Sequence, residues 1–321
     1  MIDKHFKTLD EQVEILKQKH MVITNEDYTK SILLRENYFF LNGYRHLFMI
    51  SNTNRVYKDG TTFEELYSLF LFDRTFRNIL FKNLLIIENN FKSIFSYQLS
   101  KKYGYRESDY LRNKNFTRRP DKQRQLNDLL KKMKRQIRIN GNQHTATQHY
   151  ASNYGYIPLW ILVKVLSFGI VCELFLVLKD EDQKAISDIY NLDVDTFSTY
   201  LPFLSNYRNL CAHEDILYEN KTQKLIDDTI YHKLLDIPKQ DGEYIYGKND
   251  VFALLIIMRQ LLDQDKYRSM TIEIENAIRT LDYNLKTIKI DDVLNRMGFP
   301  KNWNELANIE RSVDKDEWKR K

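Results

Sequence analysis

One short stretch of the chain combines the side chains that phosphodiester chemistry needs. Residues 205–214 read SNYRNLCAHE and bring Arg208, Asn209 and His213 together. An imidazole moves a proton near neutral pH, and a guanidinium stabilises the negative charge that builds on a phosphate under attack. The pattern therefore favours RNA cleavage without a metal ion.

The spacing of these residues argues against a complete site in one chain. On a regular helix Asn209 and His213 share a face, whereas the directions of Arg208 and His213 differ by about 140°. One chain also supplies a single proton-transfer group, but attack by a 2′-hydroxyl needs both a base and an acid. Either the helix is distorted here, or a second copy related by a twofold axis completes the site.

Structural interpretations of the same residues stay open. His213 could be a cation at a helix C-terminus next to Glu214, and Arg208 could be the partner of a core carboxylate. The candidate carboxylate is Glu88, which stands in an apolar stripe and is either solvated or paired with Arg208. Cys211 fits a small buried residue better than a nucleophile.

The rest of the chain has the composition of a helical scaffold. Its 321 residues include nine Gly and five Pro, and long segments repeat apolar residues with the helical period, so we expect a mostly α fold. The expected helices cover about 8–20, 24 into 33–45, 63–103, 121–139, two within 157–178, 195–213, 250–263 and 269–285.

Local signals refine these helices. Capping residues are predicted at Thr8, with Glu11 closing the box, and at Thr62. Asp73 is expected to cap a second helix inside 63–103, and Pro202 to kink the helix that carries Arg208. The aromatic residues of 33–45 are expected to pack in the core, and a short hairpin is predicted around 244–246.

A block of positive charge lies in the middle of the chain. Residues 101–140 contain fourteen Lys or Arg against four Asp or Glu, a balance of +10 in a chain whose total is +5. A solvated helix face is one explanation, but such a concentration of charge favours contact with RNA. The residues expected to bind RNA are Lys101, Lys102, Arg118, Arg119, Lys122, Arg124, Lys131, Lys132, Lys134, Arg135 and Arg138. A second arginine-histidine spacing, Arg138 to His144, crosses a Gly/Asn loop that fixes no geometry.

Cysteine usage and hydropathy bear on the compartment. Two cysteines are too few for a disulfide framework or a cysteine metal cluster, and the first residues lack the apolar core of a signal peptide. The apolar segment 157–178 is interrupted by Lys164, Glu173 and a break at 167–169, which indicates two buried helices. We therefore expect a cytoplasmic protein without a membrane span, cofactor or metal.

Several blocks resemble the Abi family, the AbiD/AbiF-type abortive-infection proteins of bacteria. The resemblance covers about residues 25–218, and the blocks follow the family's order. They are LLRENYFFLNGYR at 33–45, GTTFEELY at 60–67, FDRTFR at 72–77 with IE at 87–88, PLWILV at 158–163, LSFG at 166–169 and YRNLCAH at 207–213.

That family resembles a branch of the HEPN superfamily, all-helical nucleases that carry an arginine, a polar residue, a spacer and a histidine. The resemblance implies an all-α fold with a HEPN-like bundle over 56–235, N-terminal helices over 1–55 and a C-terminal helical extension over 236–321. It also implies a homodimeric, metal-independent endoribonuclease with Arg208, Asn209 and His213 at a composite site. Glu88 would support that site, and products would end in a 2′,3′-cyclic phosphate.

The family resemblance also bears on partners. AbiF-type systems resemble pairs of a protein with a small non-coding RNA, and such an RNA could occupy the basic block. The chain departs from related families after the histidine, where Glu214 and Asp215 replace a basic or aromatic residue and would repel phosphate. The leading hypothesis is a phage-defence ribonuclease restrained by RNA. The alternatives are a non-catalytic RNA-binding module and a helical component of a toxin–antitoxin pair.

Overall fold

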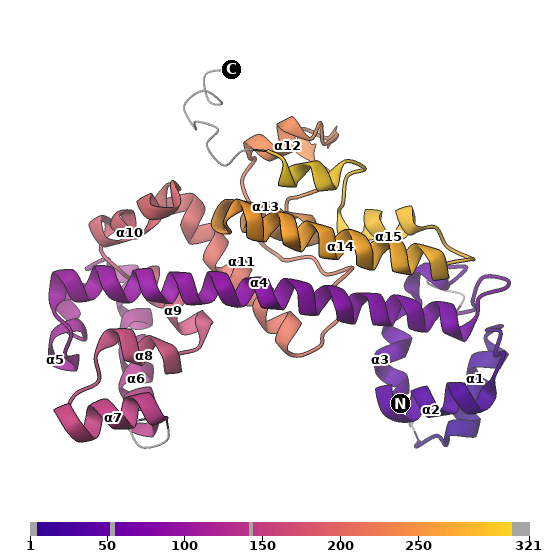
Figure 1. Ribbon diagram of the computed structural model, residues 1–321, viewed down its shortest axis with the longest axis horizontal. Helices are drawn as coiled ribbons and strands as arrows, with labels where there is room; N and C mark the ends of the chain where they lie inside the picture. The colour runs from indigo at the N-terminus through magenta and orange to yellow at the C-terminus, as the bar shows by residue number, and fades with distance from the viewer. Residues whose placement is uncertain (1–4, 52–54, 141–143, 310–321) are drawn as a thin grey trace.

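The computed structural model describes residues 5–51, 55–140 and 144–309 and is organised along one helix, α4 (Phe63–Tyr103), which runs the length of the molecule (Figure 1). Thr62 caps its first turn by accepting a hydrogen bond from the Glu65 N–H, as predicted. The Glu65 carboxylate does not return to the cap. It accepts hydrogen bonds from the backbone N–H groups of Lys286 and Thr287, which ties the start of α4 to the C-terminal part of the chain.

The prediction that Asp73 caps a second helix is wrong. Asp73 lies inside the continuous α4 and is completely buried. Its neighbours Phe72 and Phe76 are buried as well, so the packed face of the helix continues past the carboxylate. The role of Asp73 is instead to accept hydrogen bonds from other parts of the chain, as described below.

The N-terminal helices gather near the start of α4 (Figure 1). The predicted capping box is present, since Thr8 and Glu11 exchange hydrogen bonds. The predicted continuous helix through 33–45 is wrong, because Asn37 adopts φ 65° and separates two helices. Tyr44 is buried as expected, whereas Phe39 and Phe40 are 77% and 57% exposed. The elements are α1 (Leu9–Gln18), α2 (Glu26–Glu36), α3 (Tyr38–Asn42) and the 3-10 segment η1 (Gly43–Phe48).

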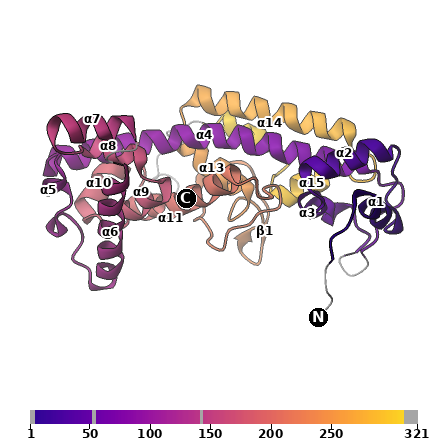
Figure 2. The same ribbon diagram turned by 90° about the horizontal axis from the view of Figure 1, so that it is seen from below.

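Short helices cover the other end of α4 (Figures 1 and 2). The basic helix, expected from 121, begins at Gln123, and Asp121 lies in the 3-10 turn before it. Two helices divide the apolar segment as predicted, and Ser167 caps the second. The elements are α5 (Glu107–Tyr110), η2 (Asn113–Asn115), η3 (Pro120–Lys122), α6 (Gln123–Asn140), α7 (Thr145–Tyr154), α8 (Leu159–Val165), α9 (Phe168–Phe175), α10 (Asp180–Ser187) and η4 (Asp188–Tyr190).

The helix with the arginine-histidine motif, α11 (Val194–Ala212), crosses α4 and is followed by further helices. α13 is buried along almost all of its length, and α14 lies alongside α4 (Figure 2). A short antiparallel hairpin is present but lies earlier than predicted, with Lys239 opposite Tyr244 and residues 245–246 outside the strands. These elements are α12 (Ile230–Leu234), β1 (Lys239–Gln240), β2 (Glu243–Tyr244), α13 (Val251–Leu261), α14 (Gln264–Asn284), α15 (Ile290–Met297) and η5 (Trp303–Ala307).

The all-α prediction is confirmed. The helix expected from 269 begins earlier, at Gln264, and α15 had no counterpart among the predicted helices. The division at 55/56 and 235/236 stays a prediction. Across the part of the chain that the structure describes, no helix has both the length and the apolar character needed to cross a membrane.

Candidate active site

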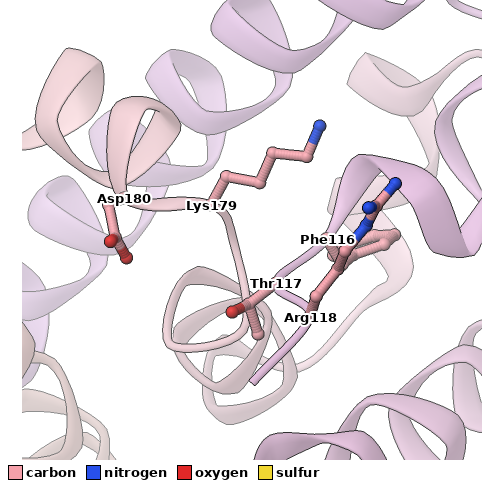
Figure 3. A pocket seen from close by; sticks show the side chains of 5 residues that line it. All are labelled: Phe116, Thr117, Arg118, Lys179 and Asp180. Carbon is pink, nitrogen blue, oxygen red and sulfur yellow. The ribbon is translucent and has the colours of Figure 1, made fainter. Parts of the chain in front are cut away.

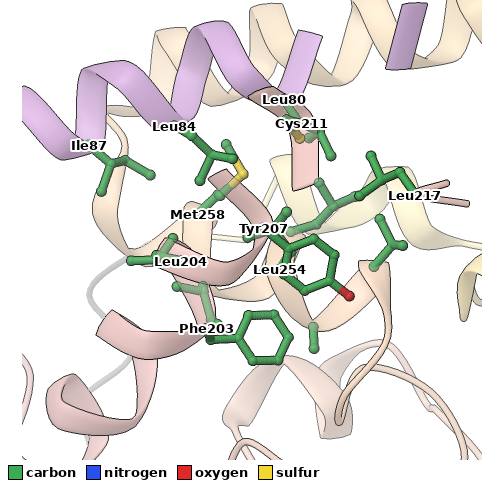
Figure 4. Packing of buried hydrophobic residues seen from close by; sticks show 14 of the residues in the cluster. Leu80, Leu84, Ile87, Phe203, Leu204, Tyr207, Cys211, Leu217, Leu254 and Met258 are labelled. Carbon is green, nitrogen blue, oxygen red and sulfur yellow. The ribbon is translucent and has the colours of Figure 1, made fainter. Parts of the chain in front are cut away.

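The position of the motif helix is set by one apolar face. Figure 4 shows that side chains of α11, among them Leu204 and Tyr207, gather with Leu84 of α4 and with Leu254 and Met258 of α13. Because this face is buried, the positions between its residues must face outward, and Asn206, Asn209 and His213 are exposed. The buried residues of the second half of α11 are Leu201, Phe203, Leu204, Tyr207 and Cys211. The helix continues through Pro202.

Arg208 is held by a carboxylate of α4. Its Nε donates to Oε2 of Glu88 at 3.1 Å, and its guanidinium carbon lies 5.6 Å from the centre of the Phe81 ring. Glu88 is buried and also accepts from Lys92 Nζ at 2.7 Å, and that amine in turn donates to the Leu166 carbonyl. Of the two interpretations of Glu88, the ion pair is the one present. Two cations and these hydrogen bonds stabilise the buried carboxylate.

The way in which Arg208 is held leaves its other donors available. The contact to Glu88 uses Nε alone, and the side chain is 27% exposed. Within the described residues the two terminal nitrogens make no hydrogen bond. These nitrogens form the planar fork that suits a phosphate or carboxylate. Arg208 is therefore held through Nε, while its two terminal nitrogens are available to bind a ligand.

His213 ends the helix. Its N–H donates to the Asn209 carbonyl at 3.0 Å, but its own φ of −101° and ψ of 7° leave the helical region. The imidazole is exposed, and within residues 5–51, 55–140 and 144–309 it makes no hydrogen bond or ion pair. His213 thus stands at the C-terminus of α11 next to Glu214, as the structural interpretation has it, and that interpretation stays open beside the catalytic one.

The segment after His213 is anchored by the buried Asp73. Its carboxylate accepts from the N–H groups of Leu217 and Tyr218, at 3.1 and 2.8 Å, and from the Tyr44 hydroxyl at 2.8 Å. Arg77, one turn along α4, forms an ion pair with the same carboxylate. Complete burial raises the pKa of Asp73, and the Arg77 charge opposes that shift. This network fixes the chain that leaves the motif helix.

Glu214 turns away from the helix in a left-handed conformation. Its φ is 57°, and the N–H of Asp215 donates back to the Leu210 carbonyl, the bond of a Schellman-type helix end. The Glu214 carboxylate lies 3.3 Å from Arg74, which also binds Glu36 through two hydrogen bonds. These bonds lower the pKa of Glu36 from its ordinary value. Part of the negative charge next to His213 is therefore compensated by Arg74.

Cys211 is unsuited to be a nucleophile. The residue is buried in the face that packs on α4 and α13, and burial raises the pKa of its thiol to about 12. Because the thiolate is the reactive form, the thiol is inert at neutral pH. Its role is packing, as the sequence indicated.

The basic residues occupy a different part of the molecule, the end formed by α5 to α10 (Figure 1). α6 packs on α8 and α9 through Leu126, Leu129 and Met133, and its cations face outward. Of the eleven cations predicted to bind RNA, Lys102 is paired with Glu181 and Asp182, and Lys132 lies 3.6 Å from Glu173. The other nine form no ion pair within the described residues, and all but the half-buried Lys122 are exposed.

An open hollow of about 310 Å³ lies beside the start of the basic helix. Figure 3 shows Arg118 and Lys179 extending to one side of it, with the Asp180 carboxylate on the other. Phe116 forms part of its lining. The hollow adds a further cation, Lys179, that lay outside the predicted basic block.

The structure thus brings some predicted residues together and keeps others apart. Glu88 contacts Arg208, and Asn209 and His213 share an exposed face, but no hydrogen bond joins Arg208 to His213 in the described chain. The basic helix is separated from α11 by α9, which packs on both. Of the competing motif, residues 141–143 lie outside the described residues.

Several supporting residues escaped the sequence interpretation. Asp73, Arg77 and Tyr44 form the network behind the motif, and Lys92 completes the pairing of Glu88. A signal was available, since each charged pair in α4 has the i, i+4 spacing of a helical ion pair within an otherwise apolar stripe.

Comparisons with known proteins give one match. A family model described as "Abi-like protein" matches residues 31–219, which is more than half of the chain and includes both α4 and α11. A comparison with curated proteins finds no match. A comparison with solved structures finds none either.

Proposed function

The chain belongs to the Abi-like protein family, and from this premise we propose that it acts in abortive infection as an endoribonuclease with a site shared between two copies. The observation that carries the proposal is the contrast within one short stretch. Arg208 is fixed through Nε with its fork open, while His213, five residues on, presents an imidazole without a partner in the described chain.

The chemistry assigned to these residues is transesterification. One His213 takes the proton of a 2′-hydroxyl, whose oxygen attacks the adjacent phosphorus. The second His213 protonates the leaving 5′-oxygen, and the Arg208 forks bind the charged phosphorane. The products end in a 2′,3′-cyclic phosphate and a 5′-hydroxyl, and no metal ion is required. Asn209, on the face of His213, would donate to a phosphate oxygen.

A dimer is part of the proposal because residues 194–213 of one chain contain a single histidine. The exposed polar face of Asn206, Asn209 and His213 supports contact with a second copy across a twofold axis. This arrangement would make the fold a HEPN-type nuclease. Its place of action would be the bacterial cytoplasm, with the basic block holding substrate RNA or a small regulatory RNA.

The test is cleavage of labelled RNA by His213→Ala in the presence of EDTA. Wild-type protein should give 2′,3′-cyclic phosphate ends, and the variant none, while its RNA affinity and melting temperature stay unchanged. His20→Asn is the matched control, because it removes another exposed histidine and suits the left-handed φ of 69° there. Unchanged cleavage by His213→Ala would refute the proposal.

A second function is favoured by the nine predicted RNA-binding cations that form no ion pair within the described residues. A non-catalytic RNA-binding module would cut no RNA under any condition, with or without EDTA, yet it would lose its RNA on charge reversal in α6. Co-purification of a protein without nucleic acid would instead favour the toxin–antitoxin alternative.

A further inference from the structure

A partly exposed row of aromatic rings lies at the same end of the molecule as the basic helix. Its members come from the segment before α5, from α7, from the α7–α8 connection and from α8. Neighbouring ring centres lie 5.9, 5.5, 6.3 and 5.4 Å apart along the row. We call this row the aromatic track, and in spatial order it consists of Trp160, Tyr105, Tyr156, Tyr154 and Tyr150.

Three of the five rings are open to solvent, and Tyr156 and Tyr150 are half-buried. Tyr154 is 57% exposed, Trp160 42% and Tyr105 41%. Aromatic residues on a folded surface are usually scattered, so five in succession call for an explanation.

Backbone geometry holds the track in place. Gly155 caps α7 in a left-handed conformation with φ 74°, which reverses the chain between Tyr154 and Tyr156. The next residue, Ile157, is fixed from both sides of its peptide. Its N–H donates to Glu107 at 2.5 Å, and its carbonyl accepts from the Tyr110 hydroxyl at 2.8 Å. The track is therefore built into the fold.

Positive charge accompanies the rings. The Arg106 guanidinium lies 5.1 Å from the centre of the Tyr156 ring and 5.9 Å from that of Tyr105. Lys164 follows Trp160 by one helical turn on the exposed face of α8. The surrounding segment 101–140 carries the +10 charge block. This charge selects an anionic partner over a neutral one.

We propose that the aromatic track binds unpaired bases of single-stranded RNA by stacking, with Arg106 and Lys164 contacting the adjoining phosphates. Rings in a row with cations beside them are what sequence-tolerant binding of single strands requires, because every base has a π face. The inference rests on the proposed function, because it takes RNA as the partner. It adds that unpaired bases are the part of the RNA that is bound, and that the aromatic track binds them.

The experiment measures RNA affinity by fluorescence anisotropy in a His213→Ala background, so that cleavage does not interfere. The probes are a single-stranded oligouridylate and an abasic oligomer of the same length and charge. Tyr154→Ala should weaken oligouridylate binding about fivefold or more and leave abasic binding and the salt dependence unchanged. Tyr154→Phe keeps the ring and should restore the affinity.

A fluorescence readout guards against effects on folding. The chain contains three tryptophans, so replacing Trp303 and Trp318 by Phe leaves Trp160 as the single reporter. Oligouridylate should quench its emission, and the abasic oligomer should not. Equal affinity for both oligomers, or an equal loss of both affinities in Tyr154→Ala, overturns the inference. Equal affinity is also the result expected if the natural partner of this surface is a protein.

The inference and the nuclease proposal fail separately. If protein with His213 intact binds RNA in a base-dependent way but does not cleave it, the aromatic track is supported and the nuclease proposal is refuted. If RNA is cleaved but Tyr154→Ala binds oligouridylate with unchanged affinity, the nuclease proposal is supported and the aromatic track is refuted.

Discussion

The end of α11 and the outer face of α6 both carry positive charge, but they hold it in opposite ways. Near the end of α11 the charges are paired and buried or partly buried, since Arg208 is paired with Glu88 and, on the adjacent α4, Arg77 with Asp73. On α6 most cations extend into solvent without an ion pair in the described chain. Chemistry requires fixed groups, and attraction of a polyanion requires charge that the protein has not neutralised. The difference indicates a division between a reacting centre and a binding surface.

The largest effect on stability is expected when Asp73, which anchors the segment after α11, is replaced. Asp73→Ala leaves Arg77 buried without its carboxylate and frees two backbone N–H groups. We expect a loss of about 3–5 kcal/mol in the free energy of unfolding. Urea denaturation measures it. Asp121→Ala, an exposed aspartate of the basic block, should change stability by less than about 0.5 kcal/mol. Equal stability of the two variants would show that the network anchors nothing.

Glu88→Gln tests whether the ion pair between Glu88 and Nε of Arg208 positions the guanidinium. The amide keeps the shape but loses the charge that pairs with Arg208 and Lys92. We expect kcat for RNA cleavage to fall about tenfold, because small misplacement of a catalytic group is costly, with KM changed less than about twofold. Steady-state kinetics separate the two constants, and Asn89→Ala is the exposed neighbour control. A change in KM alone would assign Glu88 to binding.

Charge reversal on α6 tests the binding surface. Changing Lys131, Lys134 and Arg138 to Glu should weaken RNA binding at least tenfold at low salt and lower the salt slope by about 2, because about 0.7 is lost for each phosphate contact to a single strand. The exposed triple variant of Lys233, Arg268 and Lys301 to Glu is the matched control. Similar losses in both variants would mean that overall charge, and not α6, attracts the RNA.

The smallest effects on RNA binding and stability are expected at Glu214. Two substitutions there separate the contribution of its charge, next to His213, from that of its backbone conformation. Glu214→Gln removes the charge and should tighten RNA binding up to about threefold, with stability within about 0.5 kcal/mol, since exposed ion pairs contribute little. Glu214→Gly also relieves the left-handed φ of 57° and should add up to about 1 kcal/mol of stability. Thermal unfolding and RNA titration distinguish the two, and a weaker RNA complex in either variant would contradict the expected repulsion.

Much of the fold follows from local sequence signals. The capping box at Thr8, the cap at Thr62 and the break at Ser167 each depend on neighbouring residues, and all three are present. The error at Asp73 comes from tertiary contacts. Asp73 has the type of a capping residue, but Leu217 and Tyr218, far along the chain, supply its hydrogen-bond donors. No local pattern records such a partner.

The candidate site shows the same limit. Its residue types and the spacing of Asn209 and His213 indicated a shared exposed face, and the structure has that face. The choice between a solvated and a paired Glu88 could not be made from the sequence, because it depends on how α11 crosses α4. The aromatic track was hidden for the same reason, since Tyr105 and Trp160 meet only after α5, α7 and α8 have packed together.

The most direct test of the division between reacting centre and binding surface is single-turnover cleavage of one labelled RNA, with EDTA and at saturating protein. The account predicts that His213→Ala binds the RNA with unchanged affinity and forms no 2′,3′-cyclic phosphate. It also predicts that the α6 triple reversal cleaves at the wild-type rate once its weaker binding is saturated. Cyclic phosphate from His213→Ala, at the rate of the wild-type protein, would contradict the account.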